Sequence, residues 1–271
     1  MDVPVVSVNL CVWRPDPRFF PQAVESILCQ TFEDFELIIV EDPSEIDGRG
    51  MIAHLLDDPR IRYVKNETRT GFVAQKNLAI SLSRAPYVAM MDADDISEPA
   101  RLEQQYTFSE ANPDIKVLGC QLVIIDENGR VIGYRKYPTE PRLIRKAMRR
   151  FNAIPHPAVF ADKQVLLELG GYDSEFPVAQ DYDLWARVLT KGYEMANLPQ
   201  YLLRYRLHGT SSKAAKTKEC LRKTLQVKKK YFCRQFGLGD WLRFAGEAVL
   251  GLLPARVIYE LFALFTYRKL R

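Results

Sequence analysis

The stretch YVAMMDADD, residues 87–95, decides the fold. Its first five residues form an apolar run, which is typical of a strand buried on both faces, and three of its last four residues are aspartates. A similar arrangement occurs earlier, where the mostly apolar segment FELIIV of residues 35–40 is followed by Glu41 and Asp42. Acidic residues that directly follow buried parallel strands lie at the edge of the sheet where ligands bind.

Other segments on both sides of this stretch extend the same pattern. Further strands are expected at residues 5–12 and 61–64, with helices at 20–29, 51–56, 71–84 and 99–112. This alternation predicts an α/β fold with a mostly parallel, Rossmann-like central sheet flanked by helices. The later chain is more mixed: strands 116–125 and 131–137 form a hairpin around Asp126–Gly129, and helices are expected at 141–150, 164–169 and 181–191, with a strand at 201–207.

Composition and cysteine usage restrict the class of protein. The chain has 271 residues, of which 47% are hydrophobic and 27% charged, so it is large enough for one domain with an appendage and is neither disordered nor fibrous. Its five cysteines are scattered and include no CxxC pair, which argues against a disulfide framework or a zinc knuckle. The N-terminus has no basic segment before its short apolar run, as a signal peptide would. A cytoplasmic protein is therefore expected.

Charge is distributed unevenly along the chain. Residues 1–209 hold 24 Lys and Arg against 30 Asp and Glu, whereas residues 210–271 hold 14 against 4. The apolar part of this tail, residues 241–265, is interrupted by Glu247, Pro254, Arg256 and Glu260, so it is not expected to span a membrane. An amphipathic helix pair at the inner face of the plasma membrane is one interpretation; a helical cap packed on the domain, or a homodimer contact, is the alternative.

The carboxylates themselves leave two interpretations open. Asp92 and Asp94, two residues apart at a turn, suit a hard cation such as Mg²⁺ or Mn²⁺, but Asp pairs are also common in turns without any ligand. Asp181 lies near the expected start of a helix, where it either caps the helix or takes a proton from a bound hydroxyl. Spacing alone does not distinguish these roles.

An ordered series of short motifs adds a family resemblance. From about residue 5 to residue 212 the sequence resembles the family 2 glycosyltransferases, which have the GT-A fold. The motifs are Val6–Val8, Ala23–Phe32, Phe35–Asp42, Lys76–Asn77, Met91–Asp95, Ile154–Pro157, Leu169–Asp173, Gln180–Trp185 and Tyr205–His208. Each is weak alone, but their common order is a strong indication. No QxxRW motif of processive synthases is present.

The resemblance implies a set of donor-binding residues. Asp42 would hydrogen-bond the nucleotide base, and Lys76 would contact the diphosphate. Asp92 and Asp94 would form the DxD motif, with Asp94 the more direct ligand of Mn²⁺ or Mg²⁺ and Asp92 nearer the ribose or the sugar. His208 would also approach the metal. A UDP-sugar is the default donor by family frequency.

The resemblance also implies a catalytic base and a division of the chain. Asp181 would deprotonate the acceptor hydroxyl in an inverting, non-processive hexosyl transfer, and His156 and Trp185 would border the acceptor, although structural roles suit both equally well or better. Residues 1–210 would form the catalytic domain, with the donor half at 1–100 and the acceptor half at 101–210, and residues 211–271 a helical appendage. The acceptor would be a glycan or a lipid-linked glycan in cell-surface polysaccharide synthesis.

Three other functions remain as alternatives. A sugar-1-phosphate nucleotidyltransferase would need a Gly-rich basic loop after the first strand, and residues 11–17, CVWRPDP, do not provide one. The same residues depart from the family's usual segment, which leaves the base specificity open. A catalytically inactive nucleotide-sugar or glycan-binding module predicts binding without turnover. A nucleic-acid partner rests on the basic tail alone and is not expected.

Overall fold

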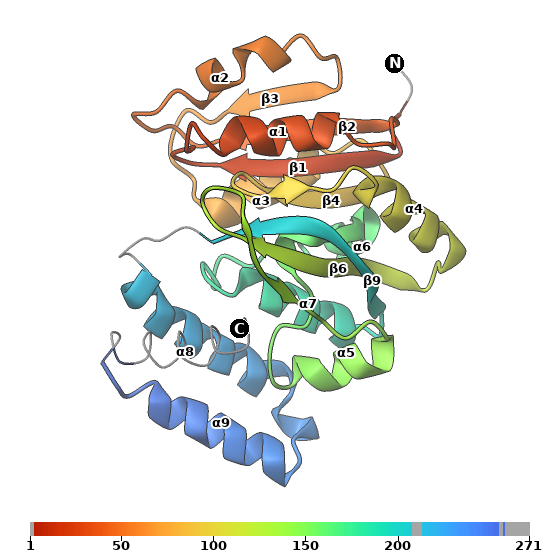
Figure 1. Ribbon diagram of the computed structural model, residues 1–271. Coiled ribbons are helices and arrows are strands. Elements are labelled where there is room, and N and C mark those ends of the chain that lie inside the picture. Colours follow the sequence, from red (N-terminus) through yellow and green to blue (C-terminus); the bar gives the residue numbers. More distant parts are fainter. Residues whose placement is uncertain (1–2, 208–212, 255–256, 258–271) are drawn as a thin grey trace.

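The computed structural model describes residues 3–207, 213–254 and 257. Within them the chain forms one nine-stranded sheet with the strand order β3-β2-β1-β4-β8-β6-β9-β5, and β7 pairs with β6. Helices cover the sheet, and the last two described helices, α8 and α9, lie together at one side of the molecule (Figure 1).

The first half of the sheet is parallel, as its sequence predicts. It consists of β1 (Val6–Val12), β2 (Phe35–Glu41), β3 (Ile61–Lys65) and β4 (Tyr87–Asp92). Every residue of β1 and β2 is buried, because helices cover both faces of this part of the sheet. These helices include α1 (Phe20–Leu28) and α3 (Phe72–Leu82).

The second half of the sheet mixes strand directions. β8 (Phe160–Asp162) runs antiparallel to β4 and β6 (Ile115–Ile125), and β6 runs parallel to β9 (Glu194–Arg206). The expected hairpin is confirmed, since β7 (Val131–Arg135) pairs antiparallel with β6. β9 begins earlier than the strand expected from residue 201, and the two-residue β5 (Ile96–Ser97), which pairs with β9, was not expected.

Most of the expected helices are present. Residues 51–56 are an exception, because α2 (Gly48–Met51) ends there and a short 3₁₀ helix, η1 (Ala53–Leu55), follows. The remaining helices of the described residues are α4 (Arg101–Ala111), α5 (Pro141–Met148), α6 (Lys163–Glu168), α7 (Gln180–Thr190), α8 (Lys213–Tyr231), α9 (Leu238–Leu250) and the short 3₁₀ helices η2 (His156–Ala158) and η3 (Cys233–Gln235), of which η2 was not expected.

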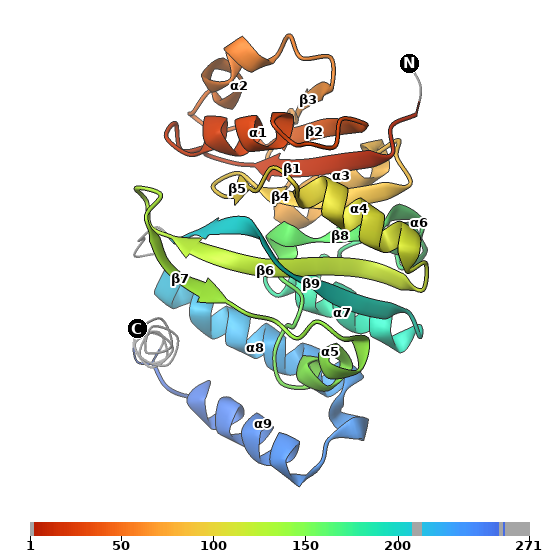
Figure 2. The same ribbon diagram turned by 45° about the vertical axis from the view of Figure 1, so that its right-hand side comes forward.

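The apolar core forms two large clusters. One joins β1, β2 and α1, and includes Leu10, Phe20 and Leu37. The other surrounds α7 and includes Trp185 together with Val227 of α8 and Phe232 just after it. Because α8 contributes to this core, the first helix of the basic tail is part of the packed fold. α9 lies outside α8, at the periphery in both views (Figures 1 and 2).

Strand order fixes where the acidic segments lie. β2 and β4 are the two neighbours of β1, and all three strands run in the same direction. Cys11 of β1 is level with Asp92 of β4, and Val12 is level with Glu41 of β2. The segments that carry Asp42 and Asp92 therefore end at the same edge of the sheet, about 10 Å apart at two strand spacings.

Candidate active site

β4 ends at Asp92, and the turn that follows carries Asp94 and Asp95. The Asp92 side chain is 38% exposed and Asp94 is partly exposed. Asp95 is fully buried, and its Oδ1 accepts a hydrogen bond of 2.9 Å from the backbone N–H of Arg206 in β9. The Arg206 guanidinium donates to the carbonyl oxygen of Asp94 at 2.8 Å. The last residue of β9 thus fixes the shape of the acidic turn.

Arg206 and Asp95 are therefore part of the site's support, although neither was predicted to have such a role. Arg206 also donates to Gln22 of α1 and packs over the ring of Phe19, with 4.3 Å from Cζ to the centroid. Their positions in the sequence motifs could have indicated such a role, because Asp95 directly follows the DxD pair and Arg206 precedes Leu207 in the last motif.

The electrostatics of Asp92 favour a cation. Removal from solvent raises the pKa of Asp92 to about 6, the positive charge of Lys76 opposes this, and the carboxylates of Asp94 and Asp181 raise the pKa further. Carboxylates that repel one another in this way are stabilised when a cation is shared between them. Among the described residues no group of three or more His, Cys, Asp and Glu side chains converges as a complete metal cage.

Lys76 lies between the two parts of the site. It extends from α3, is 7% exposed, and its Nζ lies 5.7 Å from the ring centroid of Phe72 and 5.4 Å from that of Tyr172. Its charge lowers the pKa values of both Asp92 and Asp181, partly offsetting the effect of burial on each. A single buried cation thus interacts with the carboxylates at the end of β4 and at the start of α7.

Asp181 is the second residue of α7 and remains partly exposed. Its Oδ2 accepts from the Asn152 side chain at 2.8 Å, and its Oδ1 accepts from the N–H of Tyr182 at 2.8 Å. The N-cap residue is Ala179, whose φ of 59° lies in the left-handed region. Asp181 therefore does not occupy the cap position, although its carboxylate does stabilise the first turn. Burial raises the pKa of Asp181, while Lys76 and these hydrogen bonds oppose the rise.

His156 and Trp185 differ sharply in their surroundings. The His156 Nε2 lies 2.8 Å from the hydroxyl of Tyr172, and its Nδ1 lies 3.9 Å from Asp92 Oδ1. Burial, helped by the charge of Lys76, holds the pKa of His156 well below its ordinary value, so the ring is neutral near pH 7. Trp185 is completely buried in the core around α7. It has no surface to offer an acceptor, which corrects the expectation that it borders one.

The loop before α7 is tied to α3 through a reciprocal pair of hydrogen bonds. The Asn77 side-chain amide donates to the carbonyl of Tyr172 and accepts from its N–H, both at 2.8 Å. Gly171 has a φ of 68°, and a Cβ added there would lie 2.4 Å from Asn77 Oδ1. Only glycine fits this position without displacing Asn77. The pairing places Tyr172 beside both Lys76 and His156.

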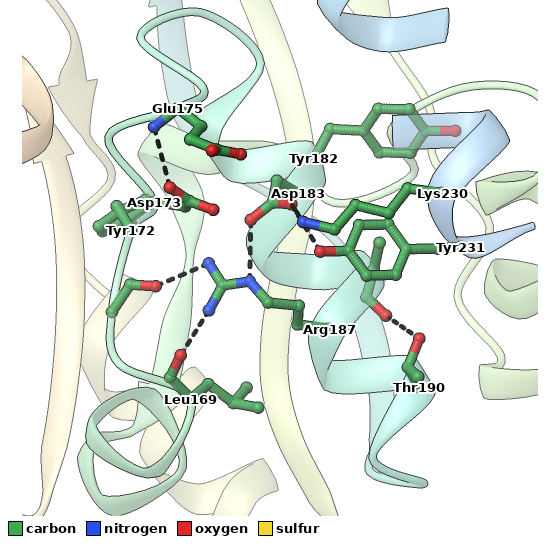
Figure 3. Close-up of polar contacts among 12 residues, drawn as sticks. Leu169, Tyr172, Asp173, Glu175, Tyr182, Asp183, Arg187, Thr190, Lys230 and Tyr231 are labelled. Carbon is green, nitrogen blue, oxygen red and sulfur yellow. Dashed lines mark hydrogen bonds and ion pairs between the residues drawn. The ribbon is translucent and has the colours of Figure 1, made fainter. Parts of the chain in front are cut away.

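Asp183 anchors α7 to its surroundings (Figure 3). This side chain is fully buried and accepts from Arg187 Nε at 2.8 Å and from the Tyr231 hydroxyl at 2.9 Å. Arg187 also donates to the carbonyl oxygens of Leu169 and Gly171, at 2.6 and 2.7 Å. Asp183 therefore joins α7 to α8 and, through Arg187, to the loop 169–171.

The carboxylate of Asp42 organises the loop before α3. Its Oδ2 accepts from the backbone N–H groups of Thr70 and Gly71, at 2.9 and 2.7 Å. Its Oδ1 accepts from the side chains of Asn66 and Thr70, at 2.8 and 2.9 Å. A carboxylate offers about four acceptor positions, and the loop 66–71 supplies four donors to Asp42.

Trp13 lies in the loop where this chain departs from the usual family segment. The guanidinium of Arg69 lies 3.8 Å from its ring centroid, and that of Arg14 lies 4.8 Å from it. Arg14 adopts a φ of 54°, which is uncommon for a residue other than glycine. Trp13 thus joins the loop after β1 to the loop 66–71 that Asp42 organises.

The predicted site residues are largely brought together. Lys76, Asp92, Asp181 and His156 form one connected group, Asp94 follows Asp92 in the turn, and Asp42 lies two strands away at the same edge. His208 lies outside the described residues.

Comparisons with known proteins identify the class to which this architecture belongs. The family model "Glycosyl transferase family 2" matches residues 14–165. An uncharacterized glycosyltransferase of Methanocaldococcus jannaschii is 32% identical over 242 residues, covering 86% of this chain and 83% of the relative. The O-antigen biosynthesis glycosyltransferase WbnJ of Escherichia coli is 34% identical over 213 residues, covering 77% and 82%.

Solved structures confirm the fold. The mannosyltransferase PcManGT of Pyrobaculum calidifontis, solved with GDP-Man and Mn²⁺, aligns with a TM-score of 0.65 at 17% identity, covering 99% of this chain and 83% of that one. Residues 1–349 of TarS from S. aureus, solved with UDP, align with a TM-score of 0.60 at 14% identity, covering 94% and 83%. The architecture is the GT-A fold. The chain belongs to the family 2 glycosyltransferases.

Proposed function

We propose that this protein transfers a hexose from a nucleotide-diphosphate sugar, with a UDP-sugar favoured, to a hydroxyl of a glycan or lipid-linked acceptor, with inversion at the anomeric carbon. The observation that carries the proposal is the group formed by Asp92, Lys76 and Asp181, in which the buried Lys76 acts electrostatically on the carboxylates at the end of β4 and near the start of α7. The naming of similar proteins after O-antigen and amylovoran biosynthesis supports a role in cell-surface polysaccharide synthesis.

The donor would bind at the carboxyl edge of the sheet. Asp94 and Asp92 supply the oxygen ligands that Mn²⁺ and Mg²⁺ prefer, and the raised pKa of Asp92 indicates negative charge that a cation would relieve. Such an ion, when bound, offsets charge that develops on the leaving diphosphate. Lys76 would bind the diphosphate, and Asp42 would meet the base while it holds the loop 66–71.

Asp181 would act as the base on the acceptor side. One of its oxygens accepts from Asn152 and the other from Tyr182, so the carboxylate is held in a fixed orientation. Partial burial raises its pKa, which makes it a stronger proton acceptor than an exposed aspartate. The acceptor hydroxyl would attack the anomeric carbon on the side opposite to the leaving diphosphate, so no covalent sugar–enzyme intermediate is required. Neutral His156, whose Nδ1 lies 3.9 Å from Asp92, would border the acceptor.

A donor screen tests this function. Purified protein is incubated with a panel of nucleotide sugars, an acceptor extract containing lipid-linked glycans, and Mn²⁺ or Mg²⁺, and released nucleoside diphosphate is measured. Release from one class of donor should require the cation and should fall about 100-fold or more in Asp94→Ala. Calorimetric binding of a donor without release under any condition would instead favour an inactive binding module.

Asn152 should adjust the pH dependence of the reaction. Its side chain donates to the charged form of Asp181, and a donor of this kind lowers a carboxyl pKa. Because the base must be deprotonated, activity should be lost as pH falls through the pKa of Asp181. In Asn152→Ala this acid limb of kcat/KM should move to higher pH, with a smaller loss of activity on its alkaline side. A uniform loss at every pH, with an unmoved acid limb, would contradict the assignment of Asp181 as the base.

A further inference from the structure

The outward face of α9 is apolar although it meets solvent. Leu238, Leu242, Ala245 and Val249 recur at intervals of four, three and four residues and therefore share one side of the helix. The leucines and the valine are 79%, 68% and 64% exposed, and Leu252 just beyond the helix is 80% exposed. In a surface helix of a soluble protein this stripe normally faces the core. Here it faces away from the rest of the molecule.

The two acidic residues of α9 contact other parts of the protein instead. Asp240 accepts from Arg150 at 2.9 Å, near the C-terminal end of α5. Glu247 pairs with the buried Lys228 of α8 at 2.5 Å and with Arg243 of its own helix at 3.0 Å. The ring of Phe244 lies 5.9 Å from that of Phe236. α9 is thus fixed in orientation by specific contacts, and its exposed apolar stripe is not the result of a helix that has rotated freely.

The elements packed next to α9 carry exposed basic side chains. Both acidic residues of α9 are occupied by the ion pairs just described. Exposed basic side chains occur on α8, on the segment before α9 and on α5: Arg222, Lys229, Arg234, Arg142 and Lys146. Residues 210–271 as a whole carry 14 Lys and Arg against 4 Asp and Glu.

We propose that the outward face of α9 binds an anionic lipid bilayer, lying in the plane of the headgroups. Apolar side chains inserted to a shallow depth, with basic residues around them, are the combination that holds a helix at such a surface. No helix in the described part of the chain is long and apolar enough to cross a membrane. The proposed attachment is peripheral and would bring the enzyme to an acceptor carried on lipid.

The charge distribution favours lipid over a second copy of the chain. Two copies joined through α9 would bring their basic tails together, which costs free energy through like-charge repulsion. The face is also small, because a helix of 13 residues is about 20 Å long. A stable interface between proteins usually buries about 800 Å² on each partner.

Vesicle flotation with the full-length protein tests this proposal without any sugar donor, so its result is independent of the proposed catalysis. Wild-type protein should bind vesicles of phosphatidylcholine with phosphatidylglycerol more tightly than vesicles of phosphatidylcholine alone. Leu242→Glu places a charge in the centre of the apolar stripe and should weaken binding about ten-fold or more. Leu167→Glu, on an exposed leucine of α6, is the matched control and should bind as the wild type does.

Tryptophan emission gives a second measurement on the same samples. Trp241 borders the apolar stripe and is 48% exposed, so its emission should shift to the blue when anionic vesicles are added. Trp241→Phe should retain binding but lose most of this shift. Equal binding by wild type and Leu242→Glu would overturn the proposal. The proposal would also be overturned if the wild-type protein does not bind vesicles but sediments as a dimer, and Leu242→Glu abolishes that dimer.

Discussion

Asp181→Asn is expected to lower the turnover number by roughly a thousand-fold while leaving the affinity for the donor nearly unchanged. Asparagine keeps the shape of the side chain and can still accept the hydrogen bond from the Tyr182 N–H, but it cannot take a proton. Since donor ligands are proposed to come from α3 and the turn after β4, binding of the donor should survive. Initial rates with the donor found in the screen, and calorimetric titration of that donor, measure the two effects.

The control for this variant is its stability. Burial raises the pKa of Asp181, which means that the folded environment disfavours its charge, so the neutral amide should unfold no more easily than the wild type. A variant that keeps at least a third of the wild-type turnover would show that another group, or water, accepts the proton. A variant that loses donor affinity and turnover in equal proportion would place Asp181 in donor binding instead.

Asp183→Ala, unlike Asp181→Asn, should destabilise the fold and lower the free energy of unfolding by about 3 kcal/mol. The side chain is fully buried, and its removal leaves the guanidinium of Arg187 without its carboxylate and the hydroxyl of Tyr231 without its acceptor. The loop 169–171 and α8 both depend on this contact (Figure 3). Urea unfolding followed by circular dichroism measures the change in the free energy of unfolding.

Tyr231→Phe is the matched variant for Asp183. It removes only the hydrogen bond of 2.9 Å between α8 and α7 and keeps the ion pair with Arg187, so it should cost about 1 kcal/mol. If Asp183→Ala costs no more than Tyr231→Phe, the buried ion pair does not hold α7 in place. Together with Asp181→Asn, these variants separate two aspartates that lie two residues apart and would otherwise look equivalent in the sequence.

The strands that were predicted best are those whose own residues show that they are buried. The segments of β1, β2 and β4 are mostly apolar, and each forms a strand that is largely buried in the sheet. β9 was only partly predicted, because Pro199 and Gln200 interrupt its pattern and its first half is defined by pairing with β6. β5 has two residues and exists only because β9 passes beside it. Such pairings depend on tertiary contacts that local patterns do not encode.

The same distinction holds for the site. The acidic motifs could be found because each carries its chemistry in adjacent residues. Asn152 lies 29 residues from Asp181, and Arg206 lies 112 residues from Asp94, so their contacts arise only in the folded chain. The ion pair between Asp183 and Arg187 could have been predicted from the sequence, since oppositely charged residues four positions apart on a helix commonly pair. Trp185 shows that a motif alone is not sufficient. Its position in the motif allowed either a contact with the acceptor or a structural role, and only the structure shows that the side chain is completely buried.

The anomeric configuration of the transferred sugar tests the central claim most directly. One carboxylate base opposite a diphosphate leaving group, with no covalent intermediate, requires a single displacement at the anomeric carbon. Proton NMR of the product, made with a donor of known configuration, should therefore show the opposite configuration in the new linkage. Retention of the donor's configuration would contradict the role assigned to Asp181 and would require a different chemical mechanism at this site.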